Sequence, residues 1–124
     1  MRVCIVDDND LLGDSLAYSL RDRGFDVRVA RDGRSGVELA RDFKPQLVLV
    51  DWRMPGMRGD EVVAALRAEH PETFLVLMSG GASRAGPGDL DAARAMADAF
   101  LEKPFTPGQL MSAIDDLKAG RRSS

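Results

Sequence analysis

Five short apolar runs, rich in valine, leucine, isoleucine and phenylalanine, recur along the chain at regular intervals. Each run is short enough for a buried strand and is followed by polar or turn-forming residues. Near-continuous apolarity is typical of parallel strands that are covered on both faces, whereas residues 26–30 alternate as an edge strand does. The predicted strands are Val3–Val6, Val27–Ala30, Leu47–Val50, Phe74–Met78 and Ala99–Leu101.

The segments between these runs have the apolar spacing of helices. Asp10 is a candidate N-cap of the first helix, and Gly24 suits the position just after its end. Prolines follow the second and third helices. Thr106, Pro107 and Gln109 predict a capping box at the start of the last helix. The first four predicted helices are Leu11–Arg23, Ser35–Phe43, Asp60–His70 and Leu90–Ala97.

Strand and helix therefore alternate five times, which predicts an α/β fold with a parallel sheet and helices on both faces. Five strands fit the flavodoxin-like doubly wound (βα)5 sandwich, with the strand order 2-1-3-4-5. Ligands of such sheets bind beyond the carboxyl ends of the strands, near the switch point between strands 1 and 3. The 124 residues allow one domain, predicted at 1–117, with a polar tail or linker stub at 118–124.

The amino-acid composition excludes several kinds of site and several classes of protein. Cys4 is the only cysteine and His70 the only histidine, which excludes an internal disulfide and a multi-histidine zinc centre. The formal net charge of −3 argues against direct nucleic-acid binding by this domain. The sequence turns acidic at Asp7, too early for a signal peptide, and no apolar stretch has the ~20 residues of a membrane helix. We therefore expect a cytoplasmic domain that does not insert into a membrane.

Polar side chains stand at the carboxyl ends of the predicted strands. Asp7, Asp8 and Asp51 bring three negative charges together, and two unit charges 4 Å apart repel by about 4 kcal/mol at an effective dielectric near 20. Such a cluster either raises its pKa values or binds a cation, and an open, all-oxygen site suits Mg²⁺. Three carboxylates and one Mg²⁺ have a net charge of −1, and the positive charge of Lys103 brings it to zero. A phosphoryl group on one aspartate, a known covalent acceptor, would also have the hydroxyl of Ser79 beside it.

In combination, four motifs make the chain resemble the receiver domain of bacterial two-component response regulators, of the chemotaxis-receiver type, from Met1 to about Leu117. They are Val6-Asp7-Asp8, Asp51-Trp52-Arg53-Met54-Pro55-Gly56, Met78-Ser79-Gly80 and Phe100-Leu101-Glu102-Lys103-Pro104-Phe105.

The resemblance implies a role for each matching residue. Asp51 is the implied phosphoacceptor, Ser79 and Lys103 bind the phosphoryl oxygens, and Phe100 is the switch aromatic. The implied Mg²⁺ ligands, with Mn²⁺ as a possible substitute, are Asp7, Asp8, Asp51 and the backbone carbonyl of Arg53. The family's Lys-Pro bond, at Lys103-Pro104 here, is often cis.

The resemblance also implies a signalling role rather than an enzyme's, because a receiver catalyses only its own phosphotransfer and slow autodephosphorylation. Its implied partners are a sensor histidine kinase or histidine phosphotransfer protein, and a downstream protein that binds the face of helix 4, strand 5 and helix 5. Phosphorylation would draw Ser79 inward and vacate space into which Phe100 turns.

Three features depart from the family pattern. Arg53 is a long cation two residues after the acceptor, where it either shields the acyl phosphate or faces solvent. Met96 stands where the family usually has the glycine that ends helix 4, so that helix either ends differently or continues. The segment 80–88 is longer and richer in glycine than usual.

Three other interpretations remain. The chain could be the N-terminal receiver of a larger response regulator with an output domain. A Mg²⁺-dependent phosphohydrolase similar to the haloacid dehalogenases would carry Asp-x-Asp on its first strand, whereas here Arg53 takes the place of the second aspartate. A phosphate-independent interaction module would have lost the acceptor or the lysine, and this chain keeps both Asp51 and Lys103.

Overall fold

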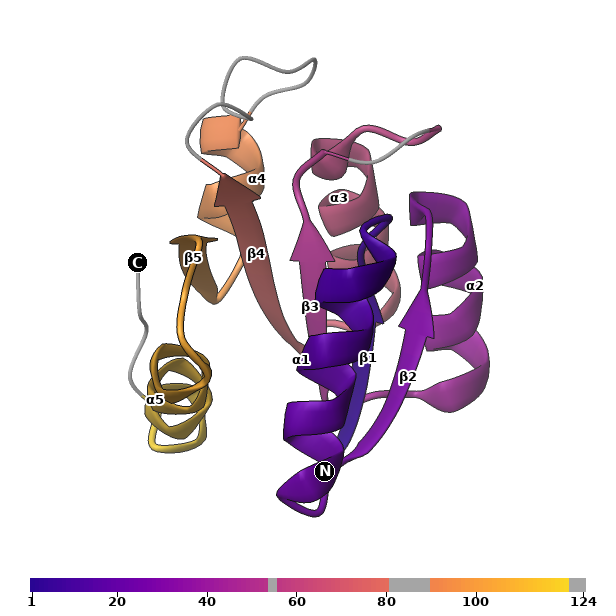
Figure 1. Cartoon of the computed structure of the whole chain (residues 1–124). Coiled ribbons are helices and arrows are strands. Elements are labelled where there is room, and N and C mark those ends of the chain that lie inside the picture. Colours follow the sequence, from indigo (N-terminus) through magenta and orange to yellow (C-terminus); the bar gives the residue numbers. More distant parts are fainter. Residues whose placement is uncertain (54–55, 81–89, 121–124) are drawn as a thin grey trace.

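The computed structural model describes residues 1–53, 56–80 and 90–120, which form one parallel sheet with helices on both faces (Figure 1). The strand order is β2-β1-β3-β4-β5, which confirms the predicted flavodoxin-like topology. The strands are β1 (Arg2–Val6), β2 (Asp26–Ala30), β3 (Leu47–Asp51), β4 (Phe74–Gly80) and β5 (Ala99–Lys103). The helices are α1 (Asp10–Asp22), α2 (Gly33–Phe43), α3 (Gly59–Glu69), α4 (Leu90–Met96) and α5 (Pro107–Lys118).

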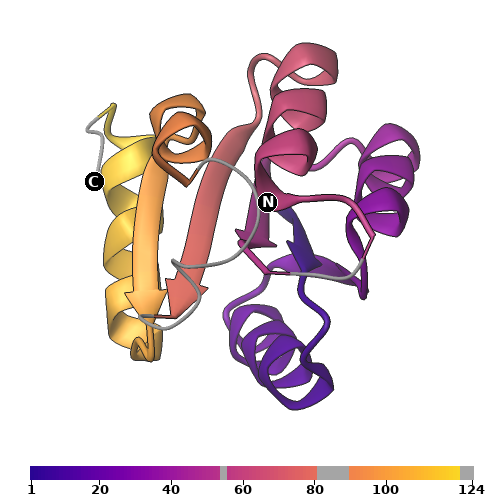
Figure 2. The same ribbon diagram turned by 90° about the horizontal axis from the view of Figure 1, so that it is seen from above.

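The sheet separates two layers of helices, as the view from above shows (Figure 2), and an apolar cluster lies on each of its faces. One layer joins side chains of α2, α3 and α4 to the sheet, with Val37, Val62 and Ala93 among them. The other layer joins α1 and α5 to the opposite face, with Leu16 and Ile114 among them. The central strand β3 is buried along its whole length, as near-continuous apolarity predicts.

Three helices begin earlier than predicted, among them α3, which begins at Gly59, one residue early. Asn9, rather than Asp10, is the N-cap of α1, because its side chain accepts a hydrogen bond from the backbone N–H of Leu12. Asp32 caps α2 in the same way through Ser35, so this helix begins at Gly33, two residues earlier than predicted. The predicted capping box of Thr106 and Gln109 is confirmed at the start of α5.

All five strands are longer than their apolar runs, and β4 and β5 extend furthest, by two residues each at their carboxyl ends. Ser79 pairs with Glu102 and Gly80 pairs with Lys103, so β4 and β5 continue together into polar sequence. Hydrogen-bonded pairing, rather than apolarity, therefore sets their carboxyl ends. As a consequence, Ser79 and Lys103 are held on paired strands at the edge of the sheet.

Helix α4 ends at Met96, so it neither needs a glycine there nor continues. Arg67 of α3 donates two hydrogen bonds to the carbonyl of Met96, through Nε at 3.2 Å and Nη2 at 3.1 Å. Its Nη2 also pairs with Asp98, whose carboxylate accepts the backbone N–H of Leu75. This network ties the end of α4 to α3 and β4. Residues 81–88 of the glycine-rich segment lie outside the described residues.

Cys4 lies in the middle of β1 and is completely buried. Burial raises the pKa of its thiol to about 12, against a smaller opposing effect from Arg28. The residue therefore acts as a small apolar side chain. Within the described ranges, none of the helices has the length and apolar character that crossing a membrane requires.

Candidate functional site

Three aspartates meet at the carboxyl edge of the sheet. Asp7 follows β1, Asp8 comes next, and Asp51 ends the neighbouring strand β3. Each offers an oxygen, and these oxygens all lie within 4.8 Å of one another. Asp7 is fully buried, Asp51 is 7% exposed and Asp8 is exposed. The structure thus brings together all three predicted carboxylate ligands, with one side open to solvent.

Backbone hydrogen bonds fix the position of Asp7. Its N–H donates to the carbonyl of Ala30 on β2 at 3.0 Å, which extends the pairing of β1 with β2 by one residue. Its Oδ1 accepts the N–H of Asn9 at 2.9 Å. The same turn places Asn9 as the cap of α1, so the start of that helix and this carboxylate are positioned together.

Lys103 reaches these carboxylates from β5, two strands away from β3. Its Nζ lies 3.1 Å from Oδ2 of Asp7 and 3.1 Å from Oδ1 of Asp51. The ammonium therefore bridges the two buried acids and compensates part of their charge. The Lys103-Pro104 peptide bond that follows is cis, as the resemblance implies.

Burial has the largest effect on the pKa of Asp51, the candidate phosphoacceptor. Desolvation raises the pKa of Asp51 from 3.8 to about 6, and the ammonium of Lys103 opposes this shift. The negative charges of Asp7 and Asp8 add smaller contributions in the upward direction. The carboxyl group is thus poised to ionise fully when a cation joins the cluster.

Ser79 lies on β4, the strand between those that carry Asp51 and Lys103. Asp51 pairs with Met78 and Lys103 pairs with Gly80, so the backbone places Ser79 between them along the edge. The serine is completely buried, and its hydroxyl donates to the carbonyl of Gly80 at 3.1 Å. This hydroxyl is thus present at the predicted position but is engaged with its own strand.

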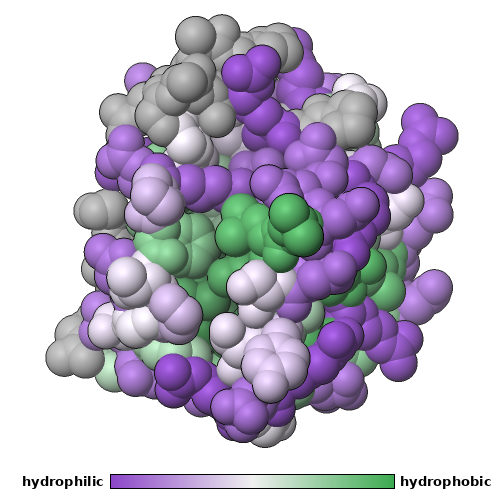
Figure 3. Space-filling view, in the orientation of Figure 1, coloured by the Kyte–Doolittle hydropathy of each residue, from purple (hydrophilic) through white to green (hydrophobic). Residues whose placement is uncertain are grey.

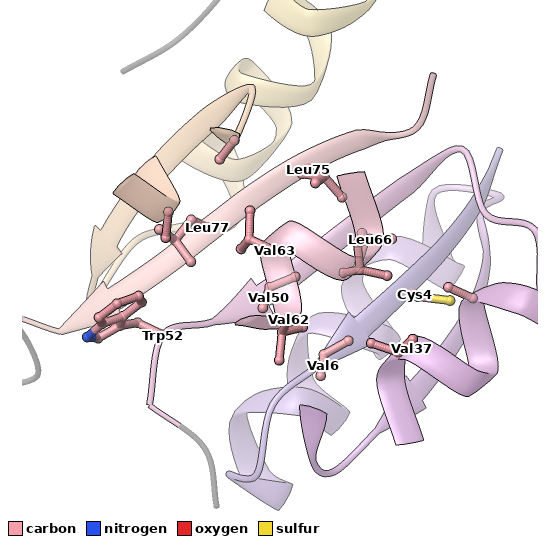
Figure 4. Close-up of a cluster of buried hydrophobic side chains, with 14 of the residues drawn as sticks. Cys4, Val6, Val37, Val50, Trp52, Val62, Val63, Leu66, Leu75 and Leu77 are labelled. Atoms are coloured by element: carbon pink, nitrogen blue, oxygen red, sulfur yellow. The ribbon is translucent and has the colours of Figure 1, made fainter. Parts of the chain in front are cut away.

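The two residues after Asp51 differ sharply in exposure. Arg53 has an exposed side chain. Trp52 is only 2% exposed and packs against Gly59, where a Cβ would lie 2.5 Å from the indole ring. Figure 4 shows this ring beside the apolar cluster, with its nitrogen pointing away from the labelled aliphatic side chains. Among the described residues, no hydrogen-bond partner is present for that buried N–H.

Phe100 lies on β5, opposite Leu77 of β4, and is 8% exposed. Phe100 is therefore buried, and its turning on phosphorylation stays a prediction. The guanidinium carbon of Arg94 on α4 lies 4.2 Å from the centre of the ring. Sequence reasoning missed both Arg94 and Arg67, because nothing local to a lone arginine on a helix indicates its distant partner.

The donor set fits a hard divalent cation. Carboxylate oxygens are the ligands that Mg²⁺ prefers, and this ion keeps several waters, which suits a site that is open at Asp8. Nothing in the cluster favours a softer metal, since its ligands include neither a thiolate nor an imidazole.

These features define a class of protein: a doubly wound α/β domain with an aspartate cluster and a lysine at its switch point. Residues 3–115 match the family described as "Response regulator receiver domain", and the chain belongs to that family. It is 33% identical over 116 residues to the "DNA-binding response regulator MtrA" of Mycobacterium leprae and of Mycobacterium tuberculosis. These alignments cover 91% of this chain, which spans about half the length of these relatives.

Solved structures agree with this assignment. The chemotaxis response regulator CheY4 of Vibrio cholerae is 27% identical, with a TM-score of 0.81 over 94% of this chain and 97% of that one. A CheY-like receiver domain protein of Methanospirillum hungatei is 25% identical, with a TM-score of 0.83 over 96% and 94% of the two chains. The chain is the receiver domain of a response regulator.

Proposed function

We propose that Asp51 accepts a phosphoryl group from a phosphohistidine of a sensor histidine kinase or a histidine phosphotransfer protein. The observation that carries this proposal is the position of Lys103, whose Nζ is 3.1 Å from both Asp51 and Asp7. A cation shared by two acids beside an open cation site suits a group that will receive further negative charge. Asp7, Asp8, Asp51 and the backbone carbonyl of Arg53 would hold Mg²⁺, or Mn²⁺ in its place.

The transfer itself exchanges one bond for another. An oxygen of the Asp51 carboxylate bonds to phosphorus, the P–N bond to the donor histidine breaks, and its electron pair stays on the imidazole nitrogen. Bound Mg²⁺ would neutralise charge on the transferred group. Lys103 then exchanges its contact with the Asp51 oxygen for a phosphoryl oxygen, and Ser79 turns its hydroxyl from the carbonyl of Gly80 towards another.

The arrangement favours a phosphoacceptor over a phosphohydrolase. A hydrolase of the aspartyl-phosphate type needs a general acid two residues after its nucleophile, and here that residue is Arg53, which cannot give up its proton. We therefore propose that the chain turns over only its own acyl phosphate, and slowly.

A protein donor also needs a surface beside Asp51. On α1, which begins three residues after Asp7, Leu11 is 86% exposed and Tyr18 is 75% exposed. They lie seven residues apart, and therefore on one side of the helix. Figure 3 shows apolar surface on this face of the molecule with polar residues around it. We place the docking site of the phosphohistidine donor on this face of α1.

We propose that phosphorylation changes the surface formed by α4, β5 and α5, and that a downstream protein binds there. Phosphorylation adds about −1.5 to −2 charges at one point, and such a local change biases a two-state element. A downstream protein would recognise that face in the cytoplasm. Because relatives named as DNA-binding response regulators are about twice as long, the domain also fits as the N-terminal receiver of a larger protein.

Labelling with a small phosphodonor tests the assignment. Acetyl phosphate with Mg²⁺ should add one phosphoryl group, which mass spectrometry of the intact and the digested chain locates on Asp51. Asp51→Asn should abolish labelling and leave the fold intact by circular dichroism. Lys103→Ala should weaken the conformational response more than the labelling, because the ammonium links the phosphoryl group to β5. A label on any other residue contradicts the assignment.

A further inference from the structure

Arg94 of α4 covers the aromatic ring of Phe100 on β5. Its guanidinium carbon is 4.2 Å from the ring centre, and the ring is 8% exposed. Phe100 belongs to the same buried apolar cluster as Trp52, Ala93 and Ala97. Arg94 itself is exposed, so the guanidinium of a surface residue stacks on a buried aromatic ring.

Hydrogen bonds at the end of α4 also help to hold Arg94 over the ring of Phe100. It lies two residues before Met96, whose carbonyl receives two hydrogen bonds from Arg67. Arg67 also bonds the carbonyls of Pro71 and Thr73 at 3.1 Å, which fixes this guanidinium against the loop between α3 and β4. The end of α4 is thereby anchored to the core, and Arg94 is presented to Phe100 from a fixed turn.

The covered ring lies between the site and the surface of α4. Phe100 precedes Lys103 by three residues on β5 and pairs with Leu77, two residues before Ser79 on β4. Trp52, in the same buried cluster, directly follows Asp51. The ring is therefore connected to the site through both strands, and it shares its cluster with Ala93 of α4.

We propose that Arg94 is a positioning residue of the phosphorylation response: by stacking on Phe100 it favours the buried position of the ring and couples the site to α4. This inference rests on the proposed function. The resemblance implies that Phe100 turns into space vacated on phosphorylation, and the stack of Arg94 favours the buried position of that ring. Because coupling between sites is reciprocal, a residue that favours the buried ring also favours a phosphoryl group at Asp51.

A titration with beryllofluoride, a phosphoryl mimic, tests this coupling. Beryllofluoride is added at saturating Mg²⁺ to the full chain, and binding is followed by the fluorescence of Trp52, its only tryptophan. Arg94→Ala should weaken the apparent affinity by about two- to fivefold, which corresponds to a cation–π contact whose guanidinium is exposed to solvent. Arg94→Lys should recover part of the loss, because lysine keeps the charge but loses the planar stacking.

The chain offers a matched control at the other edge of the sheet. Arg28 of β2 lies over the ring of Phe43 at 4.4 Å, so Arg28→Ala removes the same kind of contact far from β5. This variant should leave the beryllofluoride affinity unchanged. In a Phe100→Leu background, Arg94→Ala should have no further effect, since the partner of the guanidinium is gone.

The results of these titrations distinguish a failure of the role of Arg94 from a failure of the proposed function. An unchanged affinity in Arg94→Ala, an equal loss in Arg28→Ala, or a loss that persists without the Phe100 ring would overturn the role of Arg94. A wild-type chain that does not respond to beryllofluoride would overturn the proposed function and this inference with it. Urea unfolding of every variant confirms that the titrations compare folded chains.

Discussion

The guanidinium of Arg67 closes the end of α4 by donating two hydrogen bonds to the carbonyl of Met96. The resemblance to receivers leads one to expect glycine at position 96, where it would end the helix with a positive φ. Here the carbonyl that a helix end leaves unpaired is satisfied by a side chain from α3 instead. The substitution of methionine for glycine is thus compensated 29 residues earlier in the sequence.

Arg67→Ala should therefore lower the free energy of unfolding by about 2 kcal/mol, because it leaves several partly buried acceptors without a donor. Urea unfolding followed by circular dichroism measures the change. Arg41→Ala is the control, because Arg41 pairs with Glu69 on the surface and such a pair contributes less than about 1 kcal/mol. Equal losses in the two variants would show that the anchoring of α4 contributes nothing beyond an ordinary ion pair.

Mg²⁺ should both stabilise the chain and change its tryptophan fluorescence. Trp52 is buried beside Asp51, so a cation at the three carboxylates alters the field at the indole. Binding to the folded state alone adds about 2.7 kcal/mol at a hundredfold excess over Kd. Thermal melts and emission spectra with and without Mg²⁺ check this, and the absence of both changes would rule out the metal site.

The acidity of Asp51 predicts how stability depends on pH in metal-free solution. Burial raises its pKa to about 6, so between pH 3.8 and 6 the folded chain holds a proton that the unfolded chain has lost. The contribution of Asp51 to the free energy of unfolding therefore falls as pH rises through this window and stays unfavourable above it.

Asp51→Asn should accordingly raise the free energy of unfolding at pH 7 by about 2 kcal/mol, and the gain should shrink as the pH is lowered towards 4. Urea unfolding in a chelating buffer at several pH values measures it. Saturating Mg²⁺ should stabilise the wild type and not the variant. A gain that is independent of pH would show that the buried charge is not its cause.

Arg53→Ala should shorten the lifetime of the phosphorylated chain severalfold. The exposed guanidinium, two residues after the acceptor, can pair with a phosphoryl oxygen or obstruct the in-line approach of water. Decay of the label after removal of acetyl phosphate measures the lifetime. Arg58→Ala, which changes another exposed arginine before α3, is the control. An unchanged or longer lifetime in Arg53→Ala would mean that the side chain faces solvent throughout.

Leu11→Ser combined with Tyr18→Ser should slow phosphotransfer from a protein donor about tenfold or more, because tyrosine is among the residues enriched where truncation at an interface costs about 2 kcal/mol or more. The same variant should be labelled by acetyl phosphate at the wild-type rate. The probe is a phosphorylated histidine kinase that labels the wild-type chain. Equal slowing with both donors would indicate damage to the site rather than loss of docking.

The fold followed from sequence because its signals are local. Parallel strands buried on both faces leave continuous apolar runs, and the capping box of Thr106 and Gln109 lies within four residues. The start of α2 was missed because Gly33 is a poor helix former, and only the contact of Asp32 with Ser35 shows that the helix has begun. The ends of β4 and β5 were missed because pairing extends them past their apolar residues.

The site was only partly predictable, for a related reason. Asp7, Asp51 and Lys103 could be placed together because the topology sends every strand end to one edge. The partners of Arg67 and Arg94 are a backbone carbonyl and a ring face, and neither leaves a pattern in the sequence. Likewise, the burial of Phe100 depends on where α4 lies, which no local signal specifies.

The contact between Lys103 and Asp7 joins residues 96 positions apart, from opposite ends of the chain. A chain in synthesis carries Asp51 well before the residues of β5 have been made, and a chain cut before β5 never acquires the ammonium. In either case the acceptor has an aspartate neighbour but lacks its compensating cation. The link from a phosphoryl group on Asp51 to β5 is therefore a property of the finished domain, so an incomplete chain lacks the contact through which phosphorylation would reach that strand.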